Sequence, residues 1–383
     1  MTAGFLATAD LSPNAIERAR QRTPNYIDLT SSNPTHQGLL FPAEVLRAAA
    51  ERYWSSRRYD PDPRGNLAAR QAIVAYYAQR QPALALTPDQ VFLTASTSEA
   101  YGLLFTLLAD PGDNLLAPDV AYPLFEHLAA AHHVELRTYR LDEMRGWQID
   151  ESSLLRAADA HTRAVLLVSP HNPTGAVIQA ALPALSQLGL PLICDEVFAE
   201  FPYRVASVPP VAALHPELPV FTLNGISKMF ALPDLKLGWI ALNAPAAARY
   251  AARLELLNDL YLGANGLAQA MLPDLFARGM DFVAAMRARV RAALTMALER
   301  LAGCPRLIAQ PPDGGYYLFI RVAGCEDEEA LVLRLLARGV LVHPGYFYGC
   351  QAGAHVMISC LVAPDALAWG VERVAEAARE QIH

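Results

Sequence analysis

Two short and nearly uninterrupted apolar runs, at 163–169 and 191–194, constrain the fold of this chain most. Such runs are typical of strands buried on both faces, as in a parallel sheet covered by helices. The first run leads into Asn172-Pro173-Thr174-Gly175 and the second into Asp195. Ligands of open α/β sheets bind at the carboxyl ends of such strands. We therefore predict an α/β fold with its site at that edge.

A third predicted strand, 220–223, is followed by a lysine. Lys228 lies among Gly, Ser and apolar residues in the segment 223–230, and Lys236 follows eight positions later. Apolar surroundings disfavour the charged form of a lysine, and a neutral amine can attack a carbonyl to form a Schiff base. A single lysine is more often part of a solvated surface, so this interpretation depends on the rest of the chain.

Small hydroxyl residues begin a predicted helix directly after a strand at 91–94. The helix opens at Ser96-Thr97-Ser98 and extends to Leu108. Serine and threonine are favoured helix caps, and a helix N-terminus with free N–H groups binds anions. The segment therefore predicts either a phosphate site or an ordinary capped helix.

Composition narrows the class of protein. The chain has 383 residues, 53% of them hydrophobic, which suffices for a large core and favours two domains. The net charge of −7 gives no sign of a nucleic-acid surface, and no run of about 20 apolar residues predicts a membrane span. Five cysteines without CxxC spacing favour free thiols over disulfides or a metal site, and residues 1–10 lack a signal-peptide pattern. We expect a cytoplasmic protein.

The order Asn-Pro-Thr-Gly at 172–175, Asp195 and Ser227-Lys228, with Gly238-Trp239 beyond, resembles the class I/II aminotransferase family of fold-type I pyridoxal phosphate-dependent enzymes. The resemblance covers about residues 25–380. It implies that the cofactor is pyridoxal 5'-phosphate. It also implies that Lys228 forms the Schiff base with the cofactor and later acts as the general base.

The same resemblance assigns roles to other residues. Asp195 would pair with the pyridine nitrogen, Asn172 would donate to the 3-oxygen, and Tyr122 would stack on the ring. The phosphate would be held by Ser96, Thr97, Ser98, Ser227 and Lys236. Tyr59, in the run 59–65, would reach the phosphate of a partner subunit in a homodimer, although it can also simply pack in a turn.

We expect a large cofactor-binding domain at 45–285, with a mostly parallel sheet between helices. Residues 1–44 and 286–383 would form an N-terminal arm and a smaller α+β domain. Between them we predict a long helical stretch, 244–301, that is interrupted near 262–266 and at Pro273.

Four positions depart from the family pattern. Lys236 replaces an arginine, which keeps the charge and loses the bidentate fork. Phe198 replaces a tyrosine that donates to the 3-oxygen, and Gly225 replaces a serine. Met357 stands where the family has its carboxylate-binding arginine, so either another residue holds the carboxylate or the substrate lacks one.

The remaining substrate-site candidates come from two parts of the chain. Asn33 and Gly38 belong to the expected N-terminal lid, while His343 and Tyr346 could line the pocket beside Met357. We predict an aminotransferase that moves an amino group between an amino acid or amine and a keto acid or aldehyde. The alternatives are a lyase, decarboxylase or biosynthetic synthase on the same site, an aminotransferase-like half of a transcription regulator, and an enzyme of another fold.

Overall fold

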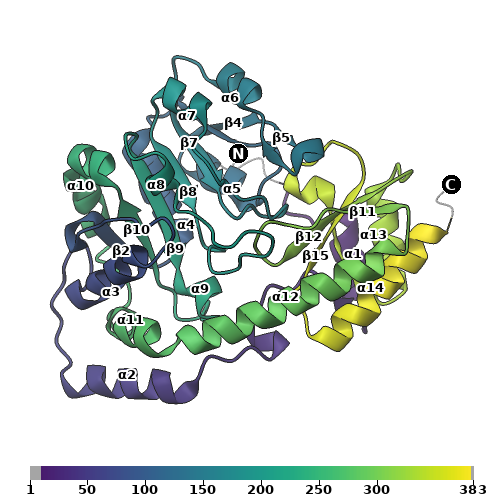
Figure 1. The fold of residues 1–383 in the computed structure, drawn as a ribbon, viewed down its shortest axis with the longest axis horizontal. Coiled ribbons are helices and arrows are strands. Elements are labelled where there is room, and N and C mark those ends of the chain that lie inside the picture. The colour runs from purple at the N-terminus through teal and green to yellow at the C-terminus, as the bar shows by residue number, and fades with distance from the viewer. Residues whose placement is uncertain (1–9, 381–383) are drawn as a thin grey trace.

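The computed structural model describes residues 10–380, so the ends of the predicted small domain, 1–9 and 381–383, lie outside the described residues. A seven-stranded sheet forms the centre of the larger part, in the order β2-β10-β9-β8-β7-β3-β4 (Figure 1). Only β10 runs antiparallel to its neighbours. Its strands are β2 (Val91–Thr94), β3 (Asn114–Pro118), β4 (Glu135–Tyr139), β7 (Thr162–Val168), β8 (Leu192–Asp195), β9 (Val220–Gly225) and β10 (Gly238–Leu242).

Helices cover both faces of this sheet, which explains why β2, β3, β8, β9 and β10 are buried along their whole length. One face packs against α4 and α10, and the other belongs to the main core. The helices of this part are α3 (Leu67–Ala78), α4 (Thr97–Leu108), α5 (Leu124–Ala131), α6 (Glu151–Ala157), α7 (Pro183–Leu188), α8 (Val211–Leu214), α9 (Ile226–Met229), α10 (Ala244–Asp259) and α11 (Gly266–Arg278). A small hairpin, β5 (Leu141–Asp142) with β6 (Gln148–Ile149), projects beside it.

The smaller part is built on an antiparallel four-stranded sheet, β11-β12-β15-β14. Its strands are β11 (Leu307–Ala309), β12 (Tyr317–Val322), β14 (His343–Pro344) and β15 (His355–Ser359). The N-terminal strand β1 (Ile27–Asp28) pairs with β13 (Val340–Leu341), which attaches the N-terminal segment to this part. Its helices are α1 (Ala15–Arg22), α12 (Met280–Ala302), α13 (Glu328–Ala337) and α14 (Pro364–Arg379), while α2 (Ala43–Ser55) packs on α11.

The predicted helix break at Pro273 is wrong. Pro273 lies inside α11. The predicted interruption near 262–266 is confirmed by the break at 260–265, and a further break lies at Gly279, between α11 and α12. Gly279 is required there because a Cβ atom would lie 2.7 Å from the ring of Phe41. The predicted boundary at 285/286 falls within the continuous helix α12, which runs along both parts (Figure 1).

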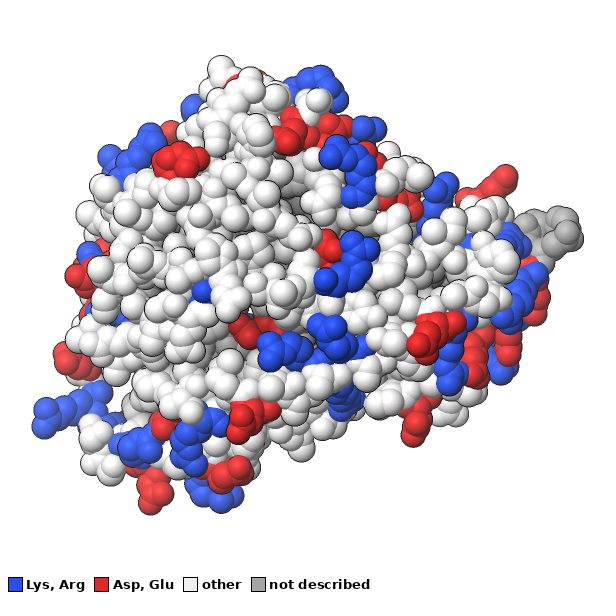
Figure 2. Space-filling view, in the orientation of Figure 1, with Lys and Arg blue, Asp and Glu red and all other residues white. Residues whose placement is uncertain are grey.

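The surface carries interspersed charges of both signs. On the face drawn in Figure 2, basic and acidic side chains alternate around wide uncharged areas. Among the described residues, no helix combines the length and the apolar character that crossing a bilayer requires.

Candidate active site

Three neighbouring parallel strands place three of the predicted residues at one edge of the sheet. Strands β7, β8 and β9 are in register at Val168, Asp195 and Leu223, so their carboxyl ends lie side by side. Asn172 follows β7, Asp195 ends β8, and Lys228 lies on α9 just beyond β9. The charge of Lys228 contributes to lowering the pKa of the Asp195 carboxyl.

Asp195 is buried and held by two donors. Its Oδ2 accepts a 2.8 Å hydrogen bond from the Tyr101 hydroxyl, and its Oδ1 accepts one of 3.0 Å from the backbone N–H of Val197. Burial raises the pKa of the Asp195 carboxyl, while Val197, Tyr101 and Lys228 lower it in that order. A buried carboxylate with these partners is suited to pairing with a positively charged ring nitrogen.

An aromatic ring lies near Lys228. Its Nζ lies 5.9 Å from the centre of the Phe198 ring. The same ring meets Tyr317 edge-on at 5.7 Å and Tyr316 at 4.9 Å. Burial raises the pKa of the Tyr317 phenol, and the charge of Lys228 lowers it. The charge of the lysine thus acts on both an acidic group from β8 and a phenol from β12.

The N-terminus of α4 faces the same edge. Ser96 caps the helix by accepting a hydrogen bond from Glu99 N at 3.1 Å. Within residues 10–380, the backbone N–H groups of Thr97 and Ser98 have no hydrogen-bond acceptor. Gly238 in β10 packs directly beneath this turn, where a Cβ atom would lie 3.0 Å from Thr97 N. Free N–H groups over a glycine form a cradle for an anion such as phosphate.

Asn172 contributes a polar atom without a partner. Its Oδ1 is buried and has no hydrogen bond among the described residues, and the same is true of Nε2 of His171. The His171 Nδ1 atom lies 2.8 Å from the Thr174 hydroxyl, and burial lowers the pKa of His171 to about 4. An unpaired buried amide oxygen fits a site that a hydrogen-bond donor of a ligand completes.

The other predicted cofactor ligands are more exposed. Tyr122 is 44% exposed and meets Phe125 edge-on at 6.0 Å. Lys236 is exposed with a positive φ of 49°, and Ser227 is half-buried. Gly225 pairs with Gly238, and a Cβ atom there would lie 2.8 Å from Leu237 O. The close approach of these two strands therefore accounts for the glycine at 225.

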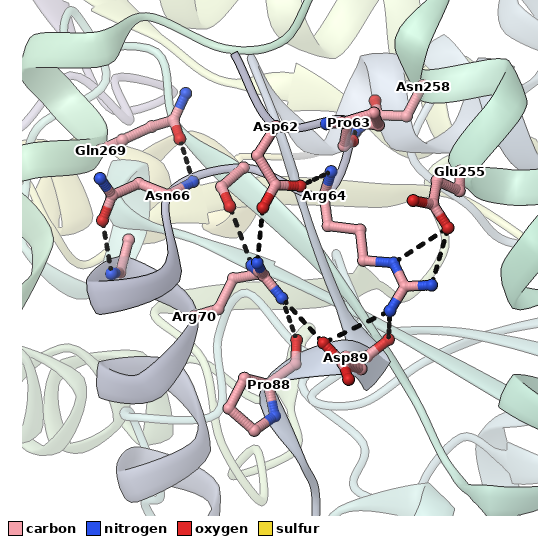
Figure 3. Close-up of polar contacts among 12 residues, drawn as sticks. Asp62, Pro63, Arg64, Asn66, Arg70, Pro88, Asp89, Glu255, Asn258 and Gln269 are labelled. Carbon is pink, nitrogen blue, oxygen red and sulfur yellow. Dashed lines mark hydrogen bonds and ion pairs between the residues drawn. The ribbon is translucent and has the colours of Figure 1, made fainter. Parts of the chain in front are cut away.

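Tyr59 is 83% exposed. The chain just after it is held firmly, as Figure 3 shows. Arg70 binds Asp62 at 2.7 Å and Arg64 binds Glu255 at 2.7 Å, while Asn258 donates to Pro63 O at 2.6 Å. Tyr59 is thus an exposed side chain just before a segment that these contacts hold in place.

The predicted substrate residues have structural contacts of their own. Asn33 Oδ1 accepts hydrogen bonds from the backbone and hydroxyl of Thr35, which forms a local turn. Gly38 is exposed and ends the short helix at Thr35–Gln37, where its N–H donates to Thr35 O. Met357 in β15 is only 2% exposed and stands opposite Phe319 and His343.

Sequence reasoning missed three residues at this site: Tyr101, Tyr317 and Ser32. Tyr101 follows Thr97 by one helical turn, a spacing that could have placed it on the same face of α4. Tyr317 follows the pair Gly314-Gly315 at the start of β12. Ser32, from the N-terminal segment, lowers the pKa of the Tyr317 phenol through a side-chain hydrogen bond.

These residues fit pyridoxal phosphate. A buried carboxylate, an anion cradle and a lysine amine lie along one sheet edge. They match the ring nitrogen, the phosphate and the aldehyde carbon of the cofactor.

Comparisons with known proteins agree with this geometry. The family model described as "Aminotransferase class I and II" matches residues 24–374. The chain is 27% identical to a tyrosine aminotransferase of Caenorhabditis elegans, over 87% of this chain and 75% of that protein. It is 27% identical to an alanine aminotransferase of Mycobacterium tuberculosis, over 91% of this chain and 84% of that protein. An alanine aminotransferase structure from Pyrococcus furiosus superposes with a TM-score of 0.89 at 24% identity, covering 100% of both chains, which supports the fold.

Proposed function

We propose, from the premise that this chain belongs to the class I and II aminotransferases, that it binds pyridoxal 5'-phosphate at the strand ends with Lys228 as the attachment point. The family uses this cofactor, which supplies an electron sink for carbanion chemistry. The observation that carries the proposal is the register of β7, β8 and β9, which brings Asn172, Asp195 and Lys228 together.

Each of these side chains has a distinct task in the proposal. Asp195 holds a proton on the pyridine nitrogen, because a buried carboxylate stabilises the adjacent positive charge. Asn172 donates from its amide to the 3-oxygen. The free N–H groups of Thr97 and Ser98, with Ser96 and Ser227 nearby, bind the phosphate, and Lys236 adds positive charge.

Lys228 also moves the proton in the reaction. The free amine of Lys228 would act as the general base that takes the proton from the α-carbon of the amino donor and would then return it as a general acid. The ring of Phe198, 5.9 Å from this amine, supplies an apolar neighbour on one side. Tyr122 would stack on the cofactor ring.

The proposed assembly is a homodimer. Apolar side chains are exposed beside Tyr59, on α2 and on the segment after α10: Trp54 at 57%, Tyr261 at 58% and Leu262 at 74%. Exposed apolar groups gathered in this way are typical of an interface. Tyr59 would then reach the phosphate of the partner subunit. The five free cysteines support the cytoplasm as the compartment.

Coexpression of two inactive variants tests the dimer. If Tyr59 acts across the interface, hybrids of Lys228→Ala and Tyr59→Ala subunits contain one complete site and recover activity. If Tyr59 acts within its own subunit, each site lacks one residue and the hybrids stay inactive.

Spectroscopy of the purified protein tests the reaction. The lysine-linked cofactor absorbs visible light, and an amino donor should remove this band as its amino group passes to the cofactor in a 1:1 ratio. Adding a keto acid should restore the band. If the protein instead releases carbon dioxide or a fragment of the donor without this exchange, the result would support a decarboxylase or a lyase.

A further inference from the structure

A short hairpin of the larger part reaches across to the sheet of the smaller part. It consists of β5, β6 and the turn between them, and its Trp147 is buried. The Trp147 ring meets Phe319 of β12 edge-on at 5.5 Å and His355 of β15 at 5.6 Å. The side-chain amide of Gln310 donates to Glu143 O at 2.9 Å. The hairpin is therefore a place where the two parts of the chain are in direct contact.

Glu143 in the turn of this hairpin faces two basic side chains of the smaller part. Its Oε1 lies 3.3 Å from Nε2 of His355, and its Oε2 lies 3.9 Å from the guanidinium of Arg321. His355 and Arg321 stand opposite each other on β15 and β12. His355 is fully buried and Glu143 is half-buried, so little water screens the contact between their side chains.

The ring of His355 has an acceptor at each of its two nitrogens. Nδ1 lies 2.8 Å from Gly353 O, and a carbonyl oxygen can only accept, so Nδ1 carries a proton. Nε2 faces the carboxylate of Glu143, which also accepts when it is ionised. The hydrogen bond between His355 and Glu143 therefore needs a second proton, in addition to the one on Nδ1.

The other charged or titratable groups around His355 cannot supply a change of charge near neutral pH. Glu328 of α13 accepts a 2.7 Å hydrogen bond from the backbone N–H of His355, not from its ring. Cys350 Sγ lies 3.4 Å from Nδ1, and burial raises the pKa of this thiol to about 11. Arg321 stays charged. Histidine changes charge between about pH 5 and 8, so His355 is the group that titrates in this range.

We propose that His355 and Glu143 form a proton-dependent link between the larger and the smaller part. In mildly acidic solution the imidazolium donates to the carboxylate and holds the hairpin against the sheet. Once the ring has lost that proton, the lone pair of Nε2 faces an acceptor 3.3 Å away, and the contact becomes repulsive. The link is therefore complete at low pH and is lost as the pH rises through the range in which histidines titrate. It goes beyond the proposed function, because neither residue takes part in it.

Hydrogen exchange of the full chain, followed by mass spectrometry, tests the link. The measured quantity is the protection factor of the hairpin amides, 141–149, at about pH 5.5 and about pH 8.5, corrected for the intrinsic exchange rate at each pH. We expect it to fall about tenfold at the higher pH, the factor that corresponds to one hydrogen bond to a charged group. His171 lines a small cavity under the hairpin, but its pKa of about 4 keeps it neutral at both pH values.

Two substitutions in the turn of the hairpin provide a matched comparison. Glu143→Gln keeps the shape of the side chain, and its amide can donate to the neutral ring, so hairpin protection should not fall at the higher pH. Arg145→Gln alters a charge on an exposed side chain in the same turn and should behave as the wild type does.

The amides of β9, inside the larger sheet, serve as the internal reference. The proposal is overturned if the wild-type hairpin is equally protected at both pH values, or if Glu143→Gln and Arg145→Gln show the same pH dependence. It is also overturned if β9 loses as much protection as the hairpin does, because the pH would then act on the whole fold.

Discussion

The hydroxyl of Tyr101 donates a 2.8 Å hydrogen bond to Asp195 Oδ2 although the residues are 94 positions apart. Because this bond stabilises the charged carboxylate, we expect Tyr101→Phe to raise the pKa of Asp195 further. The cofactor should then bind about tenfold more weakly, in line with about 1.5 kcal/mol for a hydrogen bond to a charged group. Equilibrium dialysis of the cofactor measures this change.

Tyr139→Phe is the matched control for that variant. Tyr139 is equally buried, but its hydroxyl donates to Leu166 O at 2.8 Å and not to Asp195. Equal losses of cofactor affinity in the two variants would show that the effect of Tyr101 is general destabilisation rather than support of Asp195.

The strand ends could be predicted from sequence because an apolar run and the polar residue that follows it are local patterns. Apolar runs closed by Asn172, Asp195 and the Lys228 segment are visible in the chain itself, and the structure has strands at all three places. The partners of these residues could not be predicted in the same way. Tyr101 and Tyr317 reach the site through the packing of α4 and of the smaller part, and no local pattern encodes that packing.

The N-terminal segment shows a second limit of sequence reasoning. Asn33 and Gly38 carry turn signals, and the structure gives both a local role in a turn. Ser32 has no comparable signal, but the pairing of β1 with β13 carries it to Tyr317. Likewise, Pro273 predicts a helix break from the sequence, yet it lies inside α11. Whether Asn33, Gly38 or Met357 contacts a substrate remains a prediction.

Gly238→Ala should disturb the phosphate cradle. The added methyl group would lie 3.0 Å from the backbone of Ser96 and Thr97, so the turn must move by a few tenths of an ångström. Overpacking of this kind costs about 1–3 kcal/mol, and we expect cofactor affinity to fall at least about tenfold. Gly266→Ala serves as control, because its methyl group would meet nothing closer than 3.5 Å. Unchanged affinity in Gly238→Ala would argue against the cradle as the phosphate site.

His171 should make stability depend on pH. Burial lowers its pKa from 6.5 to about 4 in the folded protein, so the unfolded chain binds more protons between these values. The free energy of unfolding should therefore fall as the pH drops from 6.5 towards 4, by up to about 3 kcal/mol from this residue. Denaturant unfolding of wild type and His171→Gln at pH 7 and pH 4.5 measures the difference. An identical pH dependence in both proteins would contradict this assignment.

Met357→Arg should place a charge in an apolar sheet. Met357 is 2% exposed and faces Phe319 and His343, so an arginine there lacks a partner and costs about 3 kcal/mol or more in stability. If position 357 adjoins the donor α-carbon, a carboxylate will restore part of that loss. We expect alanine, but not isopropylamine, to raise the Tm of the Met357→Arg variant. Equal effects of the two ligands on the Tm would show that position 357 does not adjoin the substrate site.

The central claim is that Lys228 carries the cofactor, and the chain is well suited to a direct test because Lys228 and Lys236 are its only two lysines. Borohydride reduces the carbon–nitrogen double bond that joins cofactor and lysine, which makes the link permanent, and peptide mass mapping then locates it. The account predicts one cofactor per chain, attached to Lys228, and no attachment in Lys228→Ala. Cofactor found on Lys236, or none on either lysine in protein that has bound it, would contradict the account.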